Sequence, residues 1–187
     1  RLTLAGQILY VGIFLFCFMA YLELFRADYY ERKGTLTLLF ALIVFFPVLS
    51  SIMVEQNLSS IYVVPFAMIP IIVRVFLDSR TAFMAHVTII LLCSITLRFP
   101  HEFILLQVVA GLRELSQRSQ LLRTALVVFI SYALLYFAFE LIHEDDLTKL
   151  NTRMYIYFMI NGILLLFAYP LLFLLEKIFG FTSDVTL

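Results

Sequence analysis

Long runs of apolar residues alternate with short polar connections along the whole chain. A run of about 20 apolar residues is long enough to cross a hydrocarbon core of roughly 30 Å as a helix. The apolar residues are continuous within each run and do not alternate with polar ones, which favours helices over strands. We expect seven apolar helical segments, at residues 6–25, 35–54, 59–77, 81–97, 103–112, 120–142 and 154–179.

The connections between these segments are too short to hold a folded domain outside the membrane. The sequence therefore predicts an all-α fold, a polytopic membrane bundle with seven transmembrane segments. Residues 1–179 form the transmembrane domain, and residues 180–187 begin a linker to a cytosolic domain outside this chain. The segment at residues 103–112 is the short one, since ten helical residues span only about 15 Å. A re-entrant or interfacial segment is the alternative there.

The distribution of basic residues favours a full crossing at this short segment. Cytoplasmic connections of membrane proteins carry an excess of Lys and Arg. With seven spans and the N-terminus outside, nine basic residues lie inside and four outside; without the fifth crossing, the distribution becomes seven against six. The inside residues are then Arg26, Arg32, Lys33, Arg74, Arg80, Arg113, Arg118, Arg123 and Lys177.

Composition agrees with a membrane protein and excludes a water-soluble one. Hydrophobic residues make up 63% of the 187 and charged residues 14%, about half the charged share of soluble domains. The lipid bilayer is thus the main partner. The zero net charge gives no indication of nucleic acid binding, and the prediction leaves room for a homo-oligomer.

Polar residues inside the apolar segments are the candidate functional residues, because ionisable groups are costly in hydrocarbon. Arg74 and Asp78 are spaced to meet as an i, i+4 pair near a helix end. His86 is the most deeply placed titratable group, with a hydrogen-bonded structural role favoured over sensing.

Two amides and two prolines complete the candidates for the bundle interior. Gln107 and Asn161 are expected to bond across helices. Pro65 and Pro70 share the third segment, where missing backbone donors invite a kink and a ligand pocket.

Catalytic motifs are absent from the sequence. Its three histidines form neither a metalloprotease motif nor another ligand spacing, and there is no nucleophile elbow or phosphate-binding loop. We therefore expect no catalytic residue, metal site or cofactor in this chain, which is not predicted to be an enzyme by itself.

The C-terminal stretch LEKIFGFTSDVTL, residues 175–187, resembles the segment that joins membrane and catalytic regions in a known receptor family. Residues 64–70 (VPFAMIP), leading to Asp78, and residues 116–123 (SQRSQLLR) agree with it. The family is that of the seven-transmembrane receptors with an intracellular HD hydrolase, the PgpH-type cyclic-di-AMP phosphodiesterases of bacteria.

This resemblance implies a flanking extracytoplasmic domain and a cytosolic HD domain, where divalent metal ions activate water to hydrolyse cyclic di-AMP. It implies a location in the bacterial plasma (inner) membrane. This chain would be the anchor and signal-transmitting part, with Glu176, Lys177 and Gly180 coupling the last helix to the next domain. Two alternatives stay open: a small-solute transporter or channel bundle, and a purely structural membrane anchor.

The predicted topology can be tested by cysteine accessibility mapping in intact cells. Arg118→Cys should resist a membrane-impermeant thiol reagent applied from outside, because its loop carries part of the basic excess. Arg153→Cys should be labelled from outside and is the matched control. Labelling of Arg118→Cys from the external face would contradict the topology.

Overall fold

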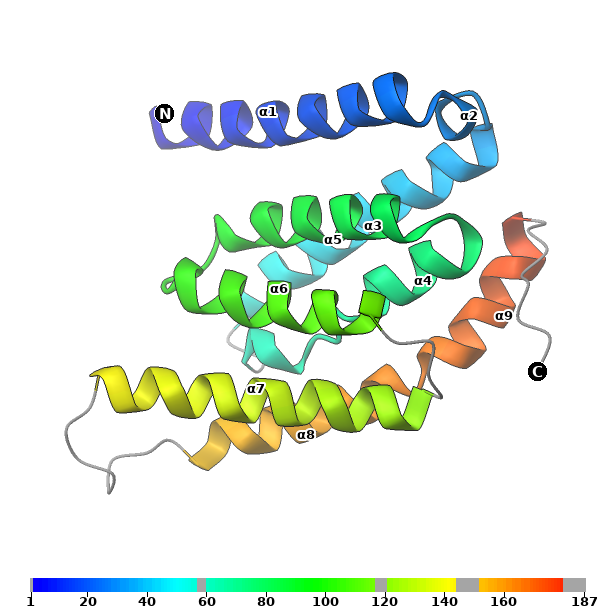
Figure 1. Cartoon of the computed structure of the whole chain (residues 1–187). Helices are drawn as coiled ribbons and strands as arrows, with labels where there is room; N and C mark the ends of the chain where they lie inside the picture. The colour runs from blue at the N-terminus through cyan, green and yellow to red at the C-terminus, as the bar shows by residue number, and fades with distance from the viewer. Residues whose placement is uncertain (1, 57–59, 117–120, 144–151, 180–187) are drawn as a thin grey trace.

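The computed structural model describes residues 2–56, 60–116, 121–143 and 152–179, and in these ranges the chain is helical without strands. Each of the seven predicted apolar segments corresponds to a helix or to a helix pair (Figure 1). The elements are α1 (Leu2–Phe25), α2 (Ala27–Tyr30), α3 (Lys33–Glu55), the 3₁₀ turn η1 (Ile61–Val63), α4 (Met68–Phe76), α5 (Ser79–Ser94), α6 (Pro100–Ser116), α7 (Leu121–His143), α8 (Thr152–Leu165) and α9 (Ala168–Phe179).

Helix α5 is the centre of the bundle. It contacts α1, α3, α4 and α6, and ten of its sixteen residues are buried. In Figure 1, α5 and α6 lie side by side in a middle layer, with α1 on one side and the α7–α8 pair on the other. Because protein surrounds α5, it can carry buried polar residues that a lipid-facing helix could not.

The long helices lie at the periphery and expose apolar side chains. In α1 the buried hydrophobic residues are Phe18 and Leu22, whereas Phe16 and Leu24 are about three-quarters exposed, at 74% and 76%. Such exposure is expected where lipid tails replace water as the solvent. The chain is therefore built as a multi-pass membrane protein.

Among the described residues, three helices are each long and apolar enough to cross a membrane, and the bent α8–α9 pair would make a fourth. The helices in the third, fourth and fifth segments are shorter. Successive segments nevertheless run between the same two ends of the bundle (Figure 1). Seven full crossings remain a prediction.

The basic residues are distributed unequally between these two ends. Helix α2, the α4–α5 turn and α9 lie at one end, and the α5–α6 connection and the start of α8 lie at the other (Figure 1). The elements at the α2 end carry Arg26, Arg32, Lys33, Arg74, Arg80, Arg123 and Lys177, and those at the opposite end carry Arg98 and Arg153.

The third segment differs from the prediction, and the helix of the fifth is longer than its apolar part. The third was expected as one helix over residues 59–77, but it is interrupted between η1 and the nine-residue α4. Val64 is extended, with φ −67° and ψ 123°, because a residue that precedes proline disfavours the helical region. The fifth apolar segment is short, as predicted, but flanking residues lengthen α6 to 17 residues, roughly 25 Å of helix. Pro100 opens it, and proline is well accommodated in a first helical turn.

The seventh segment bends by 40° between α8 and α9. Pro170 explains the bend, since it lacks the N–H that would bond the carbonyl of Leu166 and its ring crowds that carbonyl. Before it, Leu166 and Phe167 make the tighter bonds of a 3₁₀ turn, to Ile163 and Leu164 at 3.1 and 3.0 Å.

Candidate functional site

Asn161 of α8 holds the interrupted third segment. Its fully buried side chain donates hydrogen bonds from Nδ2 to the backbone carbonyls of Tyr62 and Val64, both at 2.8 Å. A continuous helix would supply a backbone N–H to the Tyr62 carbonyl, but Phe66 instead bonds Val64, at 2.9 Å. The amide of Asn161 therefore replaces a donor that the break removes.

Aromatic rings surround this contact. Phe158, one turn before Asn161, lies 5.8 Å from the ring of Tyr62 and 5.4 Å from that of Tyr132, measured between centroids. From α6, Phe103 meets Tyr62 at 6.1 Å and Phe66 at 5.2 Å. Rings from three helices thus pack around the interruption, where Tyr62, Val64 and Phe66 are buried.

A second polar contact joins α5, α6 and α7. Nε2 of the fully buried His86 lies 2.9 Å from the backbone carbonyl of Gln107. Because a carbonyl only accepts, Nε2 must carry the proton and donate. The hydroxyl of Tyr132 in turn donates to Oε1 of Gln107. Gln107 thus joins the three helices, accepting from His86 at its backbone carbonyl and from Tyr132 at its side chain.

Gly111 makes room for His86. A Cβ atom at Gly111 would overlap Cδ2 and Nε2 of the imidazole. The reason is helical geometry: the Gln107 carbonyl points toward residue 111, four positions on. An imidazole that bonds this carbonyl must therefore lie against residue 111.

At the α2 end, Asp78 anchors the turn between α4 and α5. Its carboxylate accepts from the backbone N–H of Arg80 at 3.1 Å and so caps α5. Asp78 pairs with Arg26, at 3.4 Å. Arg74 lies in the last turn of α4, and its expected i, i+4 pairing with Asp78 stays a prediction.

The guanidinium of Arg26 also lies 4.1 Å from the ring centre of Tyr29. Burial raises the pKa of the Tyr29 phenol, so this ring stays neutral beneath the cation. Arg26 thus links the end of α1 to α2 and to the α4–α5 turn.

The remaining candidates do not join these contacts. Pro65 lies at the interruption and Pro70 is buried inside α4. Glu176 and Lys177 lie in the last turns of α9, and Gly180 lies outside the described residues. Among the described residues, no three His, Cys, Asp or Glu side chains lie close enough to hold a metal ion.

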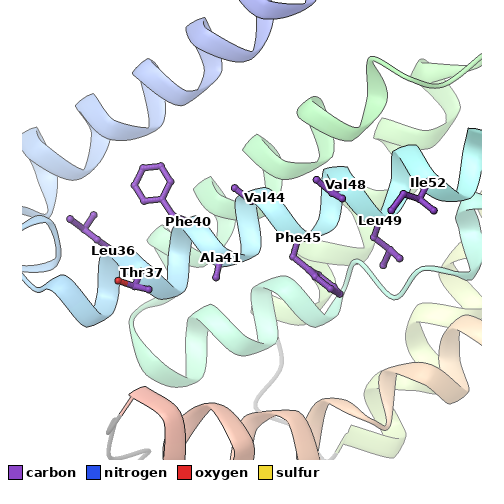
Figure 2. A pocket seen from close by; sticks show the side chains of 9 residues that line it. All are labelled: Leu36, Thr37, Phe40, Ala41, Val44, Phe45, Val48, Leu49 and Ile52. Atoms are coloured by element: carbon purple, nitrogen blue, oxygen red, sulfur yellow. The ribbon is translucent and has the colours of Figure 1, made fainter.

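A groove with a volume of about 770 Å³ runs along the outer face of α3 (Figure 2). Its lining does not include the two prolines, and the ligand pocket expected there stays a prediction. The lining of the groove is almost wholly apolar, from Leu36 at one end to Ile52 at the other. Such a face is what a lipid-facing helix presents.

Three residues of these contacts were not predicted from the sequence: Tyr132, Gly111 and Arg26. Tyr132 could have been found, since it falls mid-way along its segment, away from the interfaces where tyrosine usually gathers. The spacing of Gly111 four residues after Gln107 was a weaker signal. No local pattern connects Arg26 with Asp78, which is 52 positions away.

Gly111→Ala should destabilise the bundle through His86. The added methyl overlaps the imidazole, and overpacking of this kind costs about 1–3 kcal/mol. Gly12→Ala is the matched control, because nothing lies within 4 Å of a Cβ there. Thermal unfolding of the detergent-solubilised protein would measure both. In a His86→Ala background the cost of Gly111→Ala should shrink; an unchanged cost would contradict the contact.

Comparison of the sequence with known proteins gives a family match. No curated protein and no solved structure is similar to the chain at a significant level. The sequence matches the family described as "7TM receptor with intracellular HD hydrolase" over residues 1–183. Since this match covers nearly the whole chain, the protein belongs to the family of seven-transmembrane receptors with an intracellular HD hydrolase.

Proposed function

We propose that this chain anchors an HD phosphodiesterase in the bacterial plasma membrane and transmits a signal to it through the seventh segment. The single observation that carries the proposal is the double hydrogen bond from Asn161 to the interrupted third segment. Asn161 lies on α8, and α8 continues through a 40° bend into α9. A rearrangement at the interruption would therefore reach the helix nearest the C-terminus.

A second contact supports the same route. Helix α9 packs against α4, which follows the interruption along the chain. The third segment is thus coupled to the seventh on both sides of the bend, by Asn161 on α8 and by packing on α9. Transmission requires an element with two arrangements that the input biases unequally, and two interrupted helices in contact are suited to that.

Unpaired polar atoms near the interruption also support a second arrangement. Oδ1 of Asn161, Nε2 of Gln107 and Nδ1 of His86 are buried without a hydrogen-bond partner among the described residues. An unsatisfied buried polar atom costs about 1–3 kcal/mol. Such costs raise the free energy of this arrangement. They therefore reduce the free-energy difference between it and an alternative in which these polar atoms have other hydrogen-bond partners.

The orientation and the chemistry of the attached domain complete the proposal. The basic end of the bundle faces the cytoplasm, in line with the positive-inside rule, so that α9 leads to the cytosolic domain. The substrate we propose for that domain is cyclic di-AMP, and its metal ions are held by residues outside this chain. We propose this substrate because residues 175–187 resemble the PgpH-type linker.

A transporter or channel is less well supported by the described residues. A permeation path needs a continuous polar lining through the bundle. The two polar contacts, at Asn161 and at His86, are instead enclosed by helices and by aromatic rings such as Phe158 and Phe103. A purely structural anchor would need no coupling at Asn161, and the following experiment separates it from a transmitter.

Asn161→Leu in the full-length receptor should alter hydrolysis of cyclic di-AMP, because it removes the side-chain donor from the Tyr62 and Val64 carbonyls. Coupling mutations of this kind change an equilibrium by about 0.5–2 kcal/mol, or roughly two- to thirtyfold. Tyr132→Phe is the control: it removes one buried hydrogen bond between α6 and α7 but leaves the interruption intact. If both variants fold and neither changes basal activity or the response to the extracytoplasmic signal, the chain is an anchor only.

Inserting two glycines after Phe179 should uncouple the bundle from the hydrolase, because a flexible tether passes on no rearrangement. Basal activity should change, or the response to the extracytoplasmic signal should disappear, with membrane insertion intact. The same insertion between Glu144 and Asp145, in the connection from α7 to α8, is the control and should have little effect. Wild-type activity and response in the first variant would argue against transmission through α9.

A further inference from the structure

A second groove lies at the α2 end of the bundle, between the end of α1 and the start of α5. It has a volume of about 460 Å³, within the range of small-molecule sites. Its walls are apolar and aromatic, from Tyr21 and Phe25 on α1 and from Phe83 and Met84 on α5. Its polar part is formed by Arg26, Ser79 and Arg80.

The two arginines of this groove differ in whether an acidic side chain neutralises their charge. Arg26 is paired with Asp78 at 3.4 Å and lies 3.7 Å from Asp28. Arg80 is exposed and has no ion pair with the described residues. Its neighbour Asp78 already uses its carboxylate for Arg26 and for the cap of α5. The groove therefore offers one uncompensated positive charge beside the hydroxyl of Ser79.

We propose that this groove binds an anionic phospholipid, with its phosphate at Arg80 and Ser79 and one acyl chain along Phe25, Phe83 and Met84. The charge complementarity favours an anionic headgroup, and Arg is the side chain best suited to phosphate oxygens. The apolar walls continue toward the membrane interior, because α5 and α1 both run in that direction from the α2 end (Figure 1). An amphipathic ligand fits both parts of the groove, whereas free phosphate fits only the polar part.

Helix α1 packs loosely against the rest of the bundle, which leaves space for a lipid beside it. Apart from the short α2, the helix with which α1 makes its main contact is α5. Tyr21 reaches Thr81 at 3.4 Å, and Tyr10 donates to the carbonyl of Leu91 at 3.1 Å. An acyl chain between Phe25 and Phe83 would extend the contact between α1 and α5.

The test is native mass spectrometry of the full-length protein released from nanodiscs of mixed phosphatidylglycerol and phosphatidylcholine. Wild-type protein should retain phosphatidylglycerol in preference to phosphatidylcholine. Arg80→Gln should weaken this retention roughly fivefold, the value expected for one basic residue at an anionic headgroup. Arg32→Gln is the matched control, an exposed arginine at the same end of the bundle and outside the groove.

Four results would overturn the proposal. The first is equal retention of the two lipids, and the second is equal loss in both arginine variants, which indicates a diffuse basic surface. The third is displacement of the lipid by inorganic phosphate alone, which indicates a phosphate site without an acyl chain. The fourth is a wild-type oligomer that Arg80→Gln dissociates, which would assign the groove to a second copy of the chain. Circular dichroism of each variant confirms that the helices remain folded.

Discussion

Backbone groups released by a broken helix cannot stay unpaired in hydrocarbon, and this constraint organises the bundle. Water is absent there, so only protein can supply the missing partners. The third segment is broken at Pro65, and its freed carbonyls are bonded by Asn161. Helices α6 and α8 therefore pack against the broken segment, which places the short, interrupted elements inside and the long helices α1 and α7 outside.

The same constraint accounts for the polar residues of α5 and α6. A buried imidazole is tolerable only with a bonding partner, and His86 finds it in a backbone carbonyl of the neighbouring helix. This hydrogen bond fixes the distance between α5 and α6 and requires glycine at position 111. Polar contacts of this kind determine which helices are neighbours, whereas apolar packing alone would accept many arrangements in lipid.

The sequence predicts the positions of the helices well, because the apolar runs are long and their polar connections short. It also predicts that Asn161 and Gln107 bond across helices, and both do. It fails where the outcome depends on residues far apart in the chain. The break at Pro65 persists because an amide 96 positions later stabilises it, and Asp78 pairs with Arg26, which lies 52 positions before it. The fifth apolar segment is short, as predicted, and polar residues such as Glu102 extend α6 beyond it.

The bend between α8 and α9 turns the last helix into a lever. Helix α9 has twelve residues, so its far end lies roughly 18 Å from the bend. Each ~10° of change in the bend angle would then move that end by about 3 Å. A displacement of this size exceeds the small shifts by which packed helices usually slide. Pro170 leaves the carbonyl of Leu166 without its helical donor. The missing hydrogen bond makes a change of the bend angle easier, and a small change of that angle is what moves the far end of α9 most.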